Sequence, residues 1–121
     1  MKTLIPSKVA EIIFGLIIGM FGVFHFMDVE GMSAKIPAFM PGSASIWVYI
    51  TGSMLLLAAI SIITGKQKML ASYLLAAMLL TIALTVHLKS VVDGSEQAMG
   101  QILKDVAMAM GAILIANRSD K

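Results

Sequence analysis

Cysteine is absent from the 121-residue chain, and only 13% of its residues are charged. Without cysteine the chain forms no disulfide, thiolate metal site or iron–sulfur cluster, and it performs no thiol–disulfide exchange. A soluble domain averages about 25% charged residues, so the low charge argues against that class. The formal net charge of +2 is too small and too dispersed for a phosphate-binding stripe, and we expect no nucleic-acid partner.

Apolar residues make up 59% of the chain, which is more than a domain of this length can bury. Small domains bury only about two thirds of their surface on folding. The composition therefore excludes an ordinary soluble globule and a disordered chain. It indicates a small integral membrane protein, which contacts the lipid bilayer over most of its surface.

Four apolar stretches are long enough to cross a bilayer as helices, because about 20 helical residues span a hydrocarbon core of roughly 30 Å. The predicted spans are residues 8–27, 45–65, 69–89 and 97–117. Together they form one transmembrane domain over residues 1–121. The first span is expected to be a retained helix and not a cleaved signal peptide, because its apolar part is too long and Glu11 lies within it.

The connections between the spans predict the topology. Only residues 66–68 join the second and third spans, so these two form an antiparallel hairpin. One predicted side of the membrane carries Lys2, Lys8, Lys66, Lys68, Arg118 and Lys121, and the other carries Lys35 and Lys89. Basic residues favour the cytoplasmic side. We therefore predict an all-α, up-down-up-down four-helix bundle with both termini in the cytoplasm.

The longest connection, residues 28–44, joins the first two spans. It contains Pro37 and Pro41 and is too apolar for a solvated linker. We expect it to fold over the outer mouth of the bundle. Trp47 and Tyr49 follow it, and their amphipathic rings suit the membrane interface.

Small residues recur at helical spacing and predict which helix faces pack. In the first span one heptad seam contains Glu11, Gly15, Gly22 and His25. Close helix contact in lipid depends on such small residues, so we interpret the seam as part of the scaffold. Glu11, one turn into the helix and near Lys8, is interpreted as structural.

Four ionisable residues fall at one depth, on the side opposite the termini. They are His25 and His87, near the ends of the first and third spans, and Lys104 and Asp105 in the fourth. Ionisable groups inside a membrane are costly and usually face an interior or a cavity. Adjacent helical residues point about 100° apart, so we expect Lys104 and Asp105 not to pair with each other, and Asp105 to meet a histidine. The alternative is a snorkelling Lys104 and an Asp105 that stabilises the helix N-terminus.

Several kinds of ligand are conceivable for this cluster. A metal ion bound by both histidines and Asp105 would be repelled by Lys104. The case for a haem between the two histidines depends on those two residues alone. The 11 methionines are scattered, which favours packing over copper binding. An organic ligand fits best, since ligand sites combine apolar walls with a few convergent polar groups. We predict an outer-leaflet pocket roofed by residues 36–42 and walled by Trp47 or Tyr49.

The chain carries, in this order, the motifs GVFHF, IPAFMPG, WVYITG, VHLKS and ILKDVAMAMGA. In order and spacing they resemble the DoxX family of small four-helix bacterial membrane proteins, over residues 12–116. The resemblance implies a place in the bacterial inner membrane. It also implies a link to quinone-coupled oxidation, as in a subunit of thiosulfate:quinone oxidoreductase, or to oxidative-stress complexes. The resemblance implies a quinone as cofactor, and the positions expected to bind it are His25, Trp47, His87, Lys104 and Asp105.

Two functions of different class stay open. The first is a subunit of a membrane redox complex that binds a quinone or lipid near the outer leaflet. It is not expected to be an enzyme by itself, because it has no cysteine and no recognisable flavin or nucleotide motif, so a partner protein must accept the electrons. The second is a non-catalytic assembly factor, anchor or small-solute carrier, although a carrier is disfavoured by the lack of an inverted repeat. The apolar outer wall also permits a lateral homo-oligomer.

Overall fold

A computed structural model describes residues 3–119, and every regular element in that range is helical. Four helical stretches are long and apolar enough to cross a membrane. They are α1 (Ser7–Met27), α3 (Ala44–Thr64), the run of α4 (Lys68–Ile82), η1 (Ala83–His87) and α5 (Leu88–Val92), and α6 (Gln97–Arg118). The predicted helical class and the four spanning helices are thereby confirmed, and their length and composition are those of a multi-pass membrane protein.

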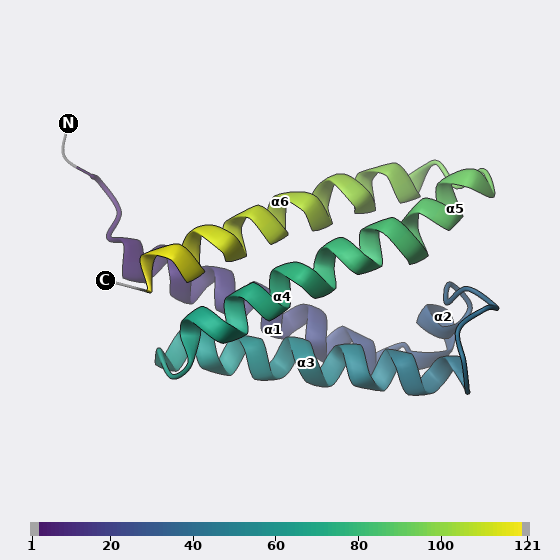
Figure 1. The fold of residues 1–121 in the computed structure, drawn as a ribbon, viewed down its shortest axis with the longest axis horizontal. Coiled ribbons are helices and arrows are strands. Elements are labelled where there is room, and N and C mark those ends of the chain that lie inside the picture. Colours follow the sequence, from purple (N-terminus) through teal and green to yellow (C-terminus); the bar gives the residue numbers. More distant parts are fainter. Residues whose placement is uncertain (1–2, 120–121) are drawn as a thin grey trace.

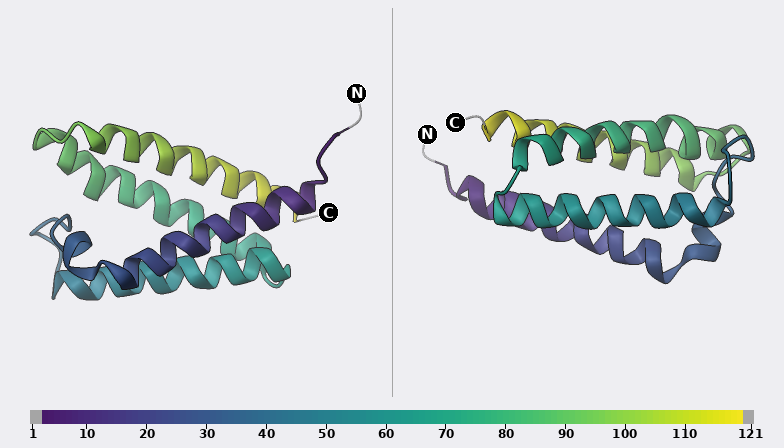
Figure 2. Two further views of the ribbon diagram at one scale, coloured as in Figure 1. Left: turned by 180° about the vertical axis from the view of Figure 1, so that it is seen from behind. Right: turned by 60° about the horizontal axis from the view of Figure 1, so that its bottom comes forward.

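The helices are arranged as two pairs. Helix α1 packs along α3 and α4 packs along α6, while α3 and α4 join the two pairs. We call the end at residues 65–67, between α3 and α4, the turn end. The opposite end, which holds residues 93–96 and the short helix α2 (Val29–Ser33), is the loop end. The pairs lie close together at the turn end and diverge toward the loop end (Figure 1 and the left view of Figure 2).

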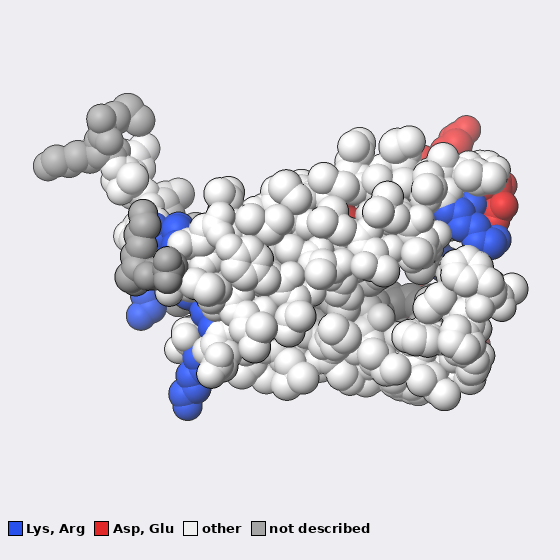
Figure 3. Space-filling model, viewed as in Figure 1, with Lys and Arg blue, Asp and Glu red and all other residues white. Residues whose placement is uncertain are grey.

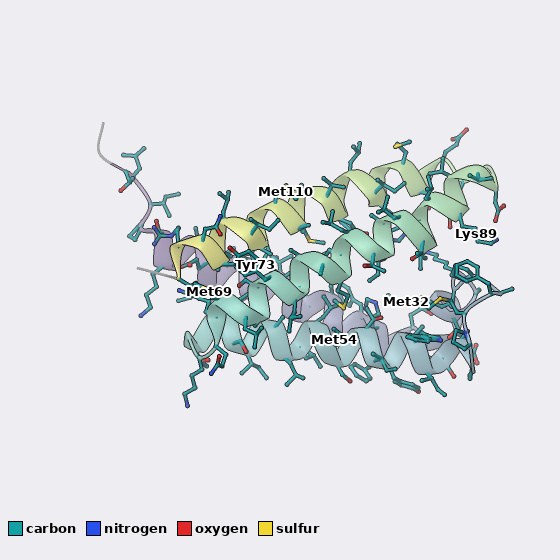
Figure 4. The ribbon with its side chains drawn as sticks, in the orientation of Figure 1. Met32, Met54, Met69, Tyr73, Lys89 and Met110 are labelled. Atoms are coloured by element: carbon teal, nitrogen blue, oxygen red, sulfur yellow. The ribbon has the colours of Figure 1, made fainter. Side chains whose placement is uncertain are left out.

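Side-chain positions follow this division. Met69 and Tyr73 lie toward the turn end, whereas Met32 and Lys89 lie at the loop end (Figure 4). Helix α3 stops at Gly65, whose φ of +83° is a left-handed conformation that glycine adopts without strain. Its N–H donates to the backbone oxygen of Ser61 (2.8 Å), and α4 begins three residues later.

Small residues bring α1 and α3 into close contact, as the predicted seam requires. A Cβ added to Gly22 would lie 3.1 Å from the backbone oxygen of Gly52, and one added to Gly52 would lie 3.2 Å from that of Gly22. Branched side chains fill the interior of the bundle, among them the buried Ile18, Leu55 and Leu75. The glycines therefore set the spacing of this pair, and the core is packed around them.

Large apolar side chains cover the outside of the bundle, and Leu57, Leu84, Leu103 and Leu114 are each more than 60% exposed. On the face shown in Figure 3, charged residues gather at the two ends, and almost all of the surface between them is uncharged. Such an exposed apolar surface suits contact with lipid tails.

The predicted loop of residues 28–44 contains a short helix that the sequence pattern did not indicate. Helix α2 begins after Asp28, whose Oδ1 accepts a hydrogen bond from the N–H of Gly31 (3.2 Å). An aspartate at this position satisfies an N–H group that the helix itself leaves unpaired. The third span also extends to Val92, three residues beyond its predicted end.

Candidate functional site

Two ionisable side chains from different helices meet inside the bundle. Nε2 of His87 lies 3.0 Å from Oδ2 of Asp105. Asp105 is only 3% exposed, and the His87 side chain is 15% exposed. The prediction that Asp105 pairs with a histidine of another helix is confirmed. Removal of a carboxylate from water is costly, and a close partner offsets that cost.

A π-helical turn carries His87 to this position. Residues Ala83–His87 form the π-helix η1 between α4 and α5, where a regular α-helix was predicted. Just before and within it, Thr81 donates to the backbone oxygen of Ala77 (2.8 Å), and Thr85 donates to that of Thr81 (2.7 Å). A π-helical turn is wider than an α-helical one and changes the direction of the side chains that follow. Such turns are rare overall, but those that occur are often found at functional sites.

Lys104 completes a cluster of three ionisable residues, the His87–Asp105–Lys104 cluster. Its Nζ lies 3.8 Å from Oδ1 of Asp105 and donates to Oε1 of Gln101 (2.6 Å). It also lies 4.6 Å from the centre of the Phe21 ring, within the range of a cation–π contact. The prediction that Lys104 and Asp105 do not pair is wrong. The two Cα–Cβ bonds do diverge, but the long lysine stem brings the ammonium group back toward the carboxylate.

His25 is connected to this cluster only indirectly, through Phe21. Its Nδ1 donates to the backbone oxygen of Phe21 (2.7 Å), and its Cβ lies where α1 approaches Gly52 of α3. Within residues 3–119 it forms no ion pair with Asp105. The structure thus separates the two histidines by role: His87 contacts the carboxylate, and His25 contacts the α1 backbone.

Trp47 contacts the segment predicted to roof the pocket, residues 36–42. Its Nε1 donates to the backbone oxygen of Pro41 (2.7 Å), so it ties the loop before α3 to that helix. Tyr49 packs against Phe26, with ring centres 5.7 Å apart. A pocket shared by all the predicted site residues stays a prediction.

Sequence reasoning missed three contacts. Glu11 pairs with Lys68 of α4 (3.3 Å) and not with its neighbour Lys8. The sequence could have indicated the contact of Lys104 with Gln101, because side chains three residues apart are neighbours on a helix. No sequence signal marked the contact with Phe21, because its ring meets Lys104 only where the α1–α3 pair approaches the α4–α6 pair.

The chemistry open to the cluster is proton transfer and binding of a polar group. His87 can accept or donate a proton, Asp105 can stabilise the protonated imidazole, and Lys104 can stabilise a developing negative charge. Within residues 3–119, no group of three or more His, Cys, Asp and Glu side chains is placed to hold a metal ion.

The fold and this cluster define a small multi-pass helical membrane protein with an ionisable interior. Residues 14–118 match the family described as a domain of unknown function, DUF8561, and the chain therefore belongs to that family. No curated protein and no solved structure matches the chain.

Proposed function

We propose that the protein is a DoxX-like subunit of a bacterial inner-membrane redox or oxidative-stress complex, and that the His87–Asp105–Lys104 cluster binds the headgroup of a quinone. The supporting observation is the His87–Asp105 pair, which lies inside the bundle at 3.0 Å with Lys104 alongside. Ionisable groups kept inside a membrane bundle at such cost generally serve a ligand or a proton.

The donor set fits a quinone headgroup, whose reduced form gives up two protons and two electrons on oxidation. His87 would accept a proton from a hydroxyl group, and Asp105 would stabilise the imidazolium that results. Lys104 would donate to the opposite oxygen, and the proton of that second hydroxyl group would pass to water at the outer surface. The electrons would pass to a partner protein, since this chain carries no cysteine to hold an iron–sulfur cluster or a redox disulfide.

We infer that the helices cross the membrane up-down-up-down with the turn end in the cytoplasm. The turn end holds Lys8, Lys66, Lys68 and Arg118, and Figure 3 shows basic side chains there. The exposed acidic residues of the described chain lie at the loop end: Asp28, Glu30, Asp93 and Glu96. An excess of Lys and Arg favours the cytoplasmic side. In this orientation the cluster lies in the outer half of the membrane.

The test is the quinone content of the full chain, purified in detergent from membranes that contain quinone. Asp105→Asn should lower the bound quinone severalfold relative to the native chain, because it removes the negative charge that pairs with His87. Asp93→Asn is the matched control, since Asp93 is exposed and, within residues 3–119, pairs with Lys89 alone. Equal quinone content in both variants contradicts the proposal. If a protein partner is retained without quinone, the alternative of a non-catalytic assembly factor, anchor or carrier is supported.

A further inference from the structure

A second polar site lies at the turn end, away from the His87–Asp105–Lys104 cluster. It is a hollow of about 300 Å³, which we call the basic hollow. Its charged lining comes from three helices: Lys8 and Glu11 of α1, Lys68 of α4 and Arg118 of α6. Three cations against one carboxylate leave a surplus of positive charge.

The one carboxylate is already engaged. Glu11 is only 7% exposed and pairs with Lys68 at 3.3 Å. Lys8 and Arg118 form no ion pair within residues 3–119. Their charges are therefore available to an anion that enters the basic hollow from the membrane surface.

An apolar groove continues from the basic hollow along the outer side of α1 and α3. It has a volume of about 390 Å³, and its lining is apolar, with Gly15, Gly19 and Ala59 among the small residues. Ile63 lines both the basic hollow and the groove. The two sites are thus neighbours that share one side chain, and the groove faces the region where lipid tails lie.

We propose that these two hollows together bind one anionic phospholipid, with its phosphate in the basic hollow and an acyl chain in the groove. Basic pockets between membrane helices attract anionic headgroups, and the adjoining groove matches the tail that such a headgroup carries. Free phosphate would satisfy the basic hollow alone. A helix of a second copy would fill the groove but would bring no anion to Lys8 and Arg118.

The experiment is native mass spectrometry of the full chain in detergent after titration with phosphatidylglycerol, with phosphatidylcholine as the zwitterionic lipid of equal chain length. The native chain should retain phosphatidylglycerol more tightly. Lys8→Gln and Arg118→Gln should each weaken its binding about fivefold, which is the effect expected of one nearby charge. Lys66→Gln is the control, because Lys66 is exposed at the same end but does not line the basic hollow.

A second pair of variants tests the groove. Gly19→Leu should lower the retention of both lipids, because the new side chain fills the groove; a Cβ there meets Ala59 at an ordinary 3.4 Å. Gly100→Leu is the matched control, since a Cβ there has nothing within 4 Å.

Two results would overturn the proposal. One is equal retention of the two lipids together with equal behaviour of Lys8→Gln, Arg118→Gln and Lys66→Gln. The other is full displacement of phosphatidylglycerol by inorganic phosphate with no effect of Gly19→Leu, which would assign the basic hollow to a soluble anion.

Discussion

The phenolic hydroxyl of Tyr73 donates a hydrogen bond to Oδ1 of Asn117, which joins the beginning of α4 to the end of α6 (Figure 4). The third and fourth spanning stretches are joined a second time, nearer the loop end, by His87 of η1 and Asp105 of α6. The α1–α3 pair instead relies on the close approach of Gly22 and Gly52. One helix pair is therefore held by polar side chains at two depths, and the other by small residues.

The first prediction concerns the coupling of His87 and Asp105. Asp105→Leu should lower the free energy of unfolding by about 3 kcal/mol, since it leaves a buried partner uncompensated. The double variant His87→Leu/Asp105→Leu should be more stable than Asp105→Leu alone, because two apolar side chains can replace a buried pair at little cost. Thermal unfolding in one detergent measures both. His87→Leu completes the cycle, and a change in the double variant equal to the sum of the two single changes would show that the two residues are not coupled.

The second prediction concerns the glycines between α1 and α3. Gly52→Ala should destabilise the protein by about 1–3 kcal/mol, because the added Cβ would lie 2.8 Å from the Cβ of His25 and 3.2 Å from the backbone oxygen of Gly22. Gly100→Ala should instead stabilise it by up to about 1 kcal/mol, since alanine favours the helix and the site is open. Thermal unfolding in one detergent measures both. Equal effects of the two substitutions would refute the close approach of the helices.

The third prediction concerns the anchor of the loop before α3. Trp47→Phe removes the donor to Pro41 and should cost about 1 kcal/mol, mostly as local opening of the loop. Trypsin should then cut faster after Lys35, which is exposed in that loop. Tyr49→Phe serves as the control, because it keeps the ring that packs on Phe26. Unchanged cleavage in Trp47→Phe would mean that the bond does not hold the loop.

The fourth prediction concerns a buried hydroxyl in α4. Ser72 is 0% exposed, and its Oγ has no hydrogen-bond partner within residues 3–119. Ser72→Ala should therefore raise the free energy of unfolding by about 1 kcal/mol, because it removes an unsatisfied polar atom from the core. Ser90→Ala, which removes a donor to the backbone oxygen of Val86, should not have this effect. A loss of stability in Ser72→Ala would reveal a partner for the hydroxyl.

Much of the fold could be predicted because its signal is local. An apolar run of about 20 residues specifies a spanning helix by itself, and the short connection at Lys66 leaves only a hairpin. The pairing of Asp105 with a histidine also followed from the sequence, since a carboxylate on a buried helix face needs a partner from another element.

The remaining contacts depend on geometry that one sequence does not contain. The π-helical turn at Ala83–His87 changes the register of its own helix, and no residue pattern marks it. The pairing of Glu11 with Lys68, and the contact of Lys104 with Phe21, depend on how the helix pairs pack. The same holds for Trp47, whose bond to Pro41 depends on the path of the loop.

The last prediction concerns the orientation of the helices in the membrane. The chain has no native cysteine, so single cysteines report one position each. Ser7 begins α1 at the turn end, Ser95 lies between α5 and α6 at the loop end, and both are exposed. With the turn end in the cytoplasm, a membrane-impermeant maleimide added to intact cells should label Ser95→Cys and not Ser7→Cys. Permeabilised cells should show labelling of both, which confirms that each thiol is reactive. Labelling of Ser7→Cys in intact cells would show the opposite orientation. The His87–Asp105–Lys104 cluster would then belong to the cytoplasmic half of the membrane.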